Sequence, residues 1–143
     1  MRTCRTSLRL VSLISCAFGL VALGCGGSIK HVPVAGKVTL NGDEKALSGF
    51  VVSFNADPEK GHQHTRISCT SRIGSDGSYS LTTDDGFKPT KGAPLGWYKV
   101  TLLSPNDLPI PANKKYTDYN KTDMAVEVVE SAAPGSYDLK FTK

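Results

Sequence analysis

The chain has 143 residues, of which 39% are hydrophobic and 21% are charged, so it has room for one compact domain and not comfortably for two. Of its 17 basic residues, Arg2, Arg5 and Arg9 lie in a segment that we expect to be removed, which leaves 14 basic against 13 acidic residues. A nearly neutral domain lacks the concentrated basic face that displaces phosphate counterions, so nucleic-acid binding is set aside.

The first 24 residues have the layout of a secretory signal peptide. Residues 1–9 carry the three arginines and no acidic residue, and residues 10–23 form an apolar run that ends just before Gly24-Cys25. This run is shorter than the roughly 20 apolar residues that a membrane-spanning helix needs, so a permanent transmembrane helix is the less economical interpretation. We therefore expect residues 1–24 to be a cleaved lipoprotein signal peptide, with plain secretion as the alternative.

Cys25 is the predicted lipidation site. Residues 22–25 read Ala-Leu-Gly-Cys, which resembles the lipobox of signal peptidase II substrates, although residues 13–16, Leu-Ile-Ser-Cys, fit that pattern slightly better. Position favours Cys25, because cleavage before Cys16 would leave an apolar run of only about six residues, against the usual 7 to 15. The nucleophilic thiol of Cys25 would take a diacylglyceryl group, and several acyl chains such as palmitate would then anchor the chain. Residues 25–31 are the expected tether.

From residue 32 onward, apolar residues recur at every second position, the spacing that places them on one face of a strand. The segments that show it are 32–40, 50–54, 67–73, 79–81, 97–102, 124–128 and 137–141. Turn-forming residues such as Asn41-Gly42 and Asp84-Asp85-Gly86 separate them. Since no window outside the signal shows a useful 3.6-residue period, helix should be minor. Residues 32–143 are predicted to form an all-β, seven-stranded antiparallel β-sandwich.

Five motifs follow one another in order over nearly the whole mature chain, at residues 34–42, 47–54, 76–81, 92–100 and 111–118. Their order and spacing resemble those of small lipoproteins, abundant in planctomycete bacteria, that carry a carboxypeptidase regulatory-like (transthyretin-like) domain. The resemblance implies a prealbumin-like or Ig-like sandwich without an established catalytic site. Residues 72–75 depart from the family, whose members often place a Thr-Asp pair before this turn.

His62 and His64 are the candidate metal ligands. Residues two apart on a strand project to the same face, so the pair could offer two imidazoles to Zn or Cu. A metal site needs more ligands, but His31 lies near the tether and Cys69 is expected to face the opposite side of its strand. A solvated loop or strand entrance is therefore the favoured interpretation, and we expect no cofactor.

Trp97 and Cys69 are the other side chains with possible chemistry. Alternation places Trp97 on the outward face of its strand, near a loop that contains Tyr116 and Tyr119. Exposed aromatic side chains can stack on sugars or dock a partner, but covering a sheet edge or packing under the loop is the favoured interpretation. Cys69 is the single cysteine beyond Cys25, and we expect it to be a small core residue.

Nothing in the sequence indicates an enzyme. The chain has no nucleophile elbow, zinc-protease helix motif or phosphate-binding loop. Its last residues, 137–143, lack the Tyr-Arg-Gly-Ser tail of the 5-hydroxyisourate hydrolases that share the transthyretin-like fold. We expect a non-enzymatic, lipid-anchored protein of the cell envelope, at the outer membrane or the periplasmic face, which contacts an envelope protein or a polysaccharide. The alternative is a periplasmic protein that binds a small ligand or a metal.

Overall fold

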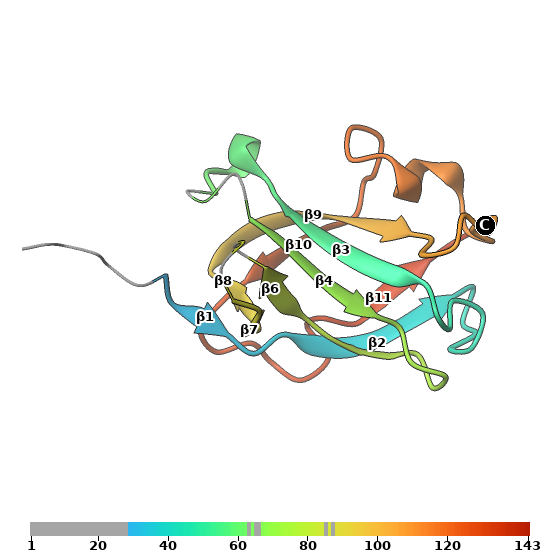
Figure 1. The fold of residues 1–143 in the computed structure, drawn as a ribbon, viewed down its shortest axis with the longest axis horizontal. Helices are drawn as coiled ribbons and strands as arrows, with labels where there is room; N and C mark the ends of the chain where they lie inside the picture. Colours follow the sequence, from blue (N-terminus) through green and yellow to red (C-terminus); the bar gives the residue numbers. More distant parts are fainter. Residues whose placement is uncertain (1–28, 63, 65–66, 85, 87) are drawn as a thin grey trace, which may run out of the picture.

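The computed structural model describes residues 29–143, apart from residues 63, 65, 66, 85 and 87 (Figure 1). Within this part the protein is mostly β, with strands in three sheets and two short 3-10 helices. None of the helices described there is long and apolar enough to cross a membrane. The predicted signal peptide and Cys25 lie outside the described residues.

The largest sheet has six strands in the order β10-β9-β3-β4-β6-β7, and every neighbouring pair is antiparallel. Its members are β3 (Val51–Ala56), β4 (Ser68–Arg72), β6 (Thr82–Asp84), β7 (Thr90–Lys91), β9 (Gly96–Leu103) and β10 (Ala125–Val128). Strands β3 and β9 make its longest pairing, from Val51 opposite Leu103 to Ala56 opposite Tyr98. This register brings the buried apolar side chains of both strands to the same face.

The second sheet has the order β11-β2-β5, with β2 at Ala35–Leu40, β5 at Ser78–Ser80 and β11 at Leu139–Phe141. Strands β2 and β5 are antiparallel, but β11 runs parallel to β2, with Leu139 opposite Val38. The prediction of a wholly antiparallel fold is therefore wrong at this pair. The chain reaches β11 through the long segment 129–138 from the other sheet, and a long crossover permits parallel pairing where a tight hairpin does not.

Each of the seven predicted segments overlaps a strand, but the described residues form eleven strands. Segment 32–40 is divided between β1 (His31–Val32), which pairs with β8 (Ala93–Pro94), and β2. Strands β7 and β8 both lie between the predicted segments 79–81 and 97–102. Strands of two residues are too short to show an alternation, which is why the sequence pattern does not reveal them.

The hydrophobic core lies between the six-stranded and three-stranded sheets, an arrangement compatible with a β-sandwich (Figure 1). Phe54 of β3 spans the two layers, since its ring centroid is 6.1 Å from that of Tyr79 on β5 and 5.9 Å from that of Tyr98 on β9. Cys69 is fully buried, which confirms its predicted inward direction. Asn41 and Gly42 also form the predicted tight turn, with φ of 50° and 88°.

Candidate functional site

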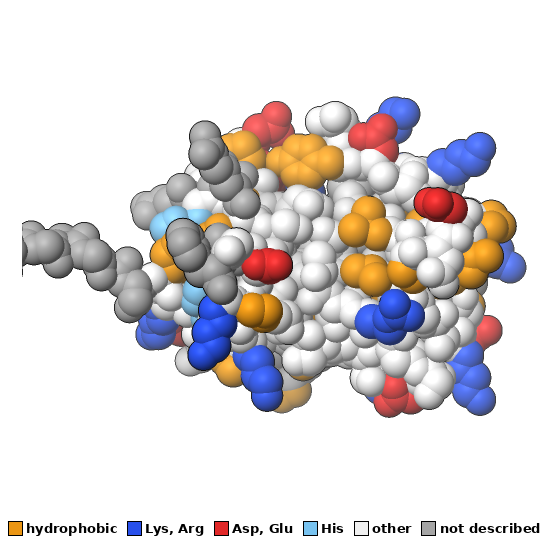
Figure 2. All heavy atoms as spheres, viewed as in Figure 1, with side chains coloured by type: hydrophobic (Ala, Val, Ile, Leu, Met, Phe, Trp, Pro, Cys, Tyr) orange, Lys and Arg blue, Asp and Glu red, His pale blue; other side chains and the backbone are white. Residues whose placement is uncertain are grey.

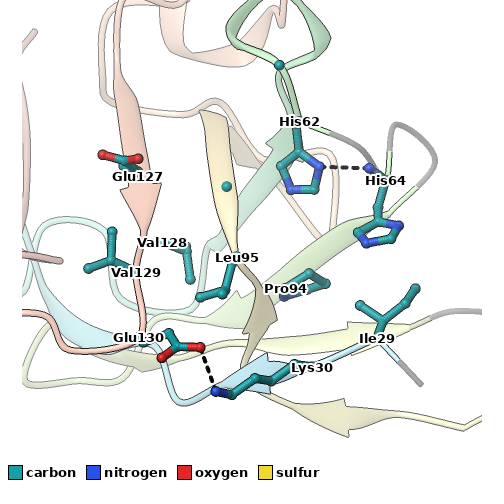
Figure 3. Close-up of a pocket in the computed structure, with 12 residues that line it drawn as sticks. Ile29, Lys30, His62, His64, Pro94, Leu95, Glu127, Val128, Val129 and Glu130 are labelled. Carbon is teal, nitrogen blue, oxygen red and sulfur yellow. Dashed lines mark hydrogen bonds and ion pairs between the residues drawn. The ribbon is translucent and has the colours of Figure 1, made fainter. Parts of the chain in front are cut away.

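A hollow of about 560 Å³ opens at the end of the domain that carries Ile29 and Lys30, just before β1 (Figure 3). Four segments far apart in the sequence line it, at residues 29–30, at 61, 62 and 64, at 94–96 and at 127–130. They come from the approach to β1, the loop after the 3-10 helix η1 (Pro58–Lys60), the start of β9 and the end of β10. The lining combines apolar side chains with one ion pair and both candidate histidines.

His62 forms the inner wall of the hollow, and it is only 4% exposed. Its ring meets that of Tyr98 edge-on, with 4.6 Å between centroids. The backbone N–H of His64 donates a hydrogen bond of 3.0 Å to His62 Nδ1 (Figure 3). Because Nδ1 accepts, the neutral ring carries its proton on Nε2. That Nε2 is buried and has no hydrogen-bond partner among the described residues.

Gly96 allows the His62 ring to lie directly against the start of β9. Its φ is +134°, and a Cβ atom at this position would be 2.7 Å from His62 Cδ2. Both the backbone conformation and the space therefore require glycine. The position of His62 is decided by Gly96 and Tyr98, which lie more than 30 residues further along the chain.

The protein should lose stability as the pH falls from about 7.5 to 5. Burial lowers the pKa of His62, and nearby His64 acts in the same direction while Asp57 opposes it. The unfolded chain therefore binds a proton at a higher pH, near 6.5, than the folded protein does, and acid favours unfolding. His62→Asn keeps an acceptor for the His64 N–H without a titratable ring, so urea denaturation at several pH values should show a shallower dependence.

The control for that measurement is Leu103→Ala on β9, which removes an exposed side chain and no titratable group and should keep the pH dependence of the wild type. Identical pH dependence in the wild type and in His62→Asn would contradict the role given to His62.

The two candidate metal ligands do lie together, with 6.0 Å between ring centroids, but not for the predicted reason. Neither is in a strand, because Gly61, at φ +81°, ends helix η1 and turns the chain into an irregular loop. His62 is buried rather than solvated, and its Nδ1 is already engaged. In the part of the chain that the structure describes, no three His, Cys, Asp or Glu side chains are grouped to hold a metal ion.

The rim of the hollow combines exposed apolar side chains with an ion pair. Ile29, Leu95 and Val129 are 37%, 36% and 38% exposed. The Nζ of Lys30 lies 2.6 Å from Glu130 Oε1, which joins the approach to β1 to the segment after β10 (Figure 3). An exposed pair of this kind contributes little to stability. Its consequence here is to neutralise the charge of Lys30 beside the apolar rim.

The outer face of the six-stranded sheet is mainly polar. In Figure 2, a broad band of backbone and uncharged polar side chains separates smaller hydrophobic groups. Ser53, Asn55 and Thr101 are neighbours on this face, and the Asn55 amide donates to the Thr101 hydroxyl at 3.1 Å. A polar outer face is typical of an antiparallel sheet, but Ser53 and Thr101 are buried here, so this part of the face is covered rather than open to solvent.

Trp97 lies on this outer face, as predicted, but it is half-buried and the Nζ of Lys60 lies 4.0 Å from its ring centroid. The two loop tyrosines are on different sides. Tyr116 is in the core with its ring edge-on to Phe141, whereas Tyr119 lies under Lys99 of the outer face. The three aromatic side chains therefore do not share one surface.

The remaining candidates have structural roles. Cys69 Sγ lies 3.1 Å from the Thr83 hydroxyl, and burial raises the pKa of the thiol, so a reactive thiolate is disfavoured. Asp84 Oδ1 accepts a 2.9 Å hydrogen bond from the Gly86 N–H, which is ordinary turn chemistry. Asp85 lies outside the described residues.

Comparison of the chain with protein-family models, with curated proteins and with solved structures finds no match. The functional argument therefore depends on the residues themselves.

Proposed function

We propose that the protein is a lipid-anchored β-domain of the cell envelope, attached through Cys25 and exposed at the outer membrane or the periplasmic face. Its role is one of interaction or structure rather than catalysis, toward an envelope protein or a polysaccharide. We also propose that its two layers belong to the carboxypeptidase regulatory-like type of sandwich that its motifs resemble.

The observation that carries this proposal is the distance in sequence between the lipobox-like motif and the folded domain. The basic residues 1–9 and the apolar residues 10–23 lead directly to Gly24-Cys25, and the first strand, β1, begins at His31. Only residues 26–30 separate the proposed lipid from this strand. A lipid on Cys25 would therefore hold the domain at the membrane without a second anchoring segment.

The state of the thiols supports the same assignment. Cys4 and Cys16 fall within the segment that processing would remove, and Cys69 is buried with a raised pKa. Cys25 is then the cysteine of the mature chain that remains available for acylation.

The non-catalytic role is supported by the sequence, which has no nucleophile elbow, zinc-protease helix motif or phosphate-binding loop.

The Cys25→Ser variant tests the anchor. In a bacterial host that processes lipoproteins, the wild-type protein should begin at Cys25, carry the mass of a diacylglyceryl group and an acyl chain, and sediment with membranes. Cys25→Ser should lack the lipid and leave the membrane fraction, because a hydroxyl does not replace the thiol in the acylation step. Intact-mass spectrometry and membrane fractionation measure both effects.

Cys16→Ser is the matched control, and it should retain both the lipid and the membrane association. Loss of the lipid in Cys16→Ser would move the anchor to the competing motif. An unmodified mature N-terminus at any other residue would show plain secretion instead.

A further inference from the structure

The described part of the chain carries an apolar patch at its entry end, formed by Ile29, Leu95 and Val129 around the hollow, and we call it the entry patch. The three side chains come from different segments, yet all line the same depression (Figure 3). Exposed apolar side chains that gather in this way mark a contact surface more often than scattered ones do.

We propose that the entry patch rests on the lipid bilayer that holds the anchor, so that the domain docks on the membrane with a defined orientation. This inference depends on the proposed lipidation of Cys25. It adds that the domain is not free on its tether, and that its opposite end is the one presented to partners.

The length of the tether carries the first step. Four Cα–Cα steps lead from Cys25 to Ile29, and a fully extended chain spans at most about 3.6 Å per residue, so Ile29 lies within about 14 Å of the lipid-bearing residue. The entry patch is therefore kept at the depth of the lipid headgroups. Even a weak contact becomes populated at such a high effective concentration.

The length of β9 carries the second step. This strand runs from Gly96 at the hollow to Leu103 at the opposite end of the domain (Figure 1). The eight residues span seven steps of about 3.3 Å, which places the far end of the strand about 23 Å from the entry end. The exposed Leu103 and Leu108 belong to that far region and cannot reach the same membrane surface when the entry patch docks.

The charges around the entry patch indicate the kind of lipid contact. Lys30 is neutralised by Glu130, and Glu127 adds a further negative charge to the lining. Electrostatic attraction to anionic headgroups therefore contributes little, and the apolar side chains drive the contact. Docking should be equally strong on zwitterionic vesicles and on vesicles that contain an anionic lipid.

Cysteine accessibility tests the orientation. The lipidated Leu95→Cys variant, in phosphatidylcholine vesicles, should react with a membrane-impermeant maleimide several-fold more slowly than the same variant made unlipidated by Cys25→Ser. Leu108→Cys is the matched control at the far end, and it should react at the same rate in both forms. Both forms also carry Cys4→Ser and Cys16→Ser, and Cys69 is fully buried, so no other thiol contributes background.

Equal labelling rates at residue 95 in the lipidated and unlipidated forms would overturn the inference, because the domain would then be free on its tether. Disulfide-linked dimers of Leu95→Cys would overturn it in favour of a second copy of the chain as the occupant. Mass spectrometry and vesicle flotation of each sample separate these results from failure of the proposed anchor, in which the lipid itself would be missing.

A second measurement leaves the entry patch unchanged. Trp97 is the single tryptophan of the chain and follows Gly96, which lines the hollow, so its fluorescence reports on the entry end. Lipids that carry a quencher at the headgroup should quench Trp97 in the lipidated protein and not in the Cys25→Ser protein. Absence of quenching in the lipidated protein would contradict docking through this end.

Discussion

Replacing Phe54 by alanine should destabilise the protein by about 3 to 5 kcal/mol, the range for removing a buried aromatic ring. Phe54 has no exposed surface, and its ring lies between Tyr79 of the facing sheet and Tyr98 of the neighbouring strand. Both neighbours have hydroxyls fixed by backbone carbonyls, at Tyr137 and Pro94, so they cannot close readily over the cavity. Urea denaturation followed by circular dichroism measures the loss.

The control for Phe54→Ala is Leu103→Ala on the adjacent strand β9. Leu103 is 45% exposed, so its truncation should change the free energy of unfolding by no more than about 0.5 kcal/mol. Small domains have a total stability of about 5 to 15 kcal/mol, so a loss of this size can unfold the alanine variant completely. Phe54→Leu is the milder substitution to measure in that case. It should recover much of the stability, and equal losses in the alanine and leucine variants would argue against a cavity effect.

Replacing Gly92 by alanine should have the second largest effect, and it should loosen the entry of the chain into the domain. Gly92 has φ of +92°, and a Cβ atom there would lie 2.1 Å from the carbonyl oxygen of Val32. The clash would push β1 away from β8 and disturb the 2.7 Å hydrogen bond from the Thr83 hydroxyl to the Gly92 carbonyl. We expect a loss well above about 2 kcal/mol, because the clash adds to the cost of a left-handed backbone, together with faster amide exchange in β1.

Gly49→Ala is the control that separates the cost of a strained backbone from the cost of the steric clash at Gly92. Gly49 has a similar φ of +86°, but no atom outside its immediate chain neighbours lies within 4 Å of the position of a Cβ. It should therefore show only the cost of a left-handed backbone, about 1 to 2 kcal/mol, with no change in the exchange of β1. The same stability loss in both variants would show that the contact with Val32 relaxes without cost.

The alternation of apolar residues predicts the central strands well. Segments 50–54 and 97–102 coincide with most of β3 and β9, and Cys69 faces inward as its position in the pattern requires. The pattern succeeds there because the alternation of side chains along a strand is a local property of the backbone. A strand with one buried face and one solvated face must show this alternation, whichever strand it pairs with.

The direction and partner of a strand are not local, and that is where the predictions fail. Segment 137–141 is recognisable as a strand, but nothing in its residues shows that β11 lies parallel to β2. His62 and His64 have the spacing of a strand pair, yet Gly61 turns the chain and Gly96 admits the His62 ring. Each of these outcomes depends on residues that meet only when the two sheets pack.

The sequence by itself determined the mostly β character of the domain, and it predicts the signal segment and Cys25 as the anchor. Only the tertiary structure decided which apolar side chains remain exposed and where they gather. Ile29, Leu95 and Val129 come from three distant segments, and no periodicity links them. Burial is a property of the assembled surface, because a side chain is covered or left open by neighbours that arrive from elsewhere in the chain.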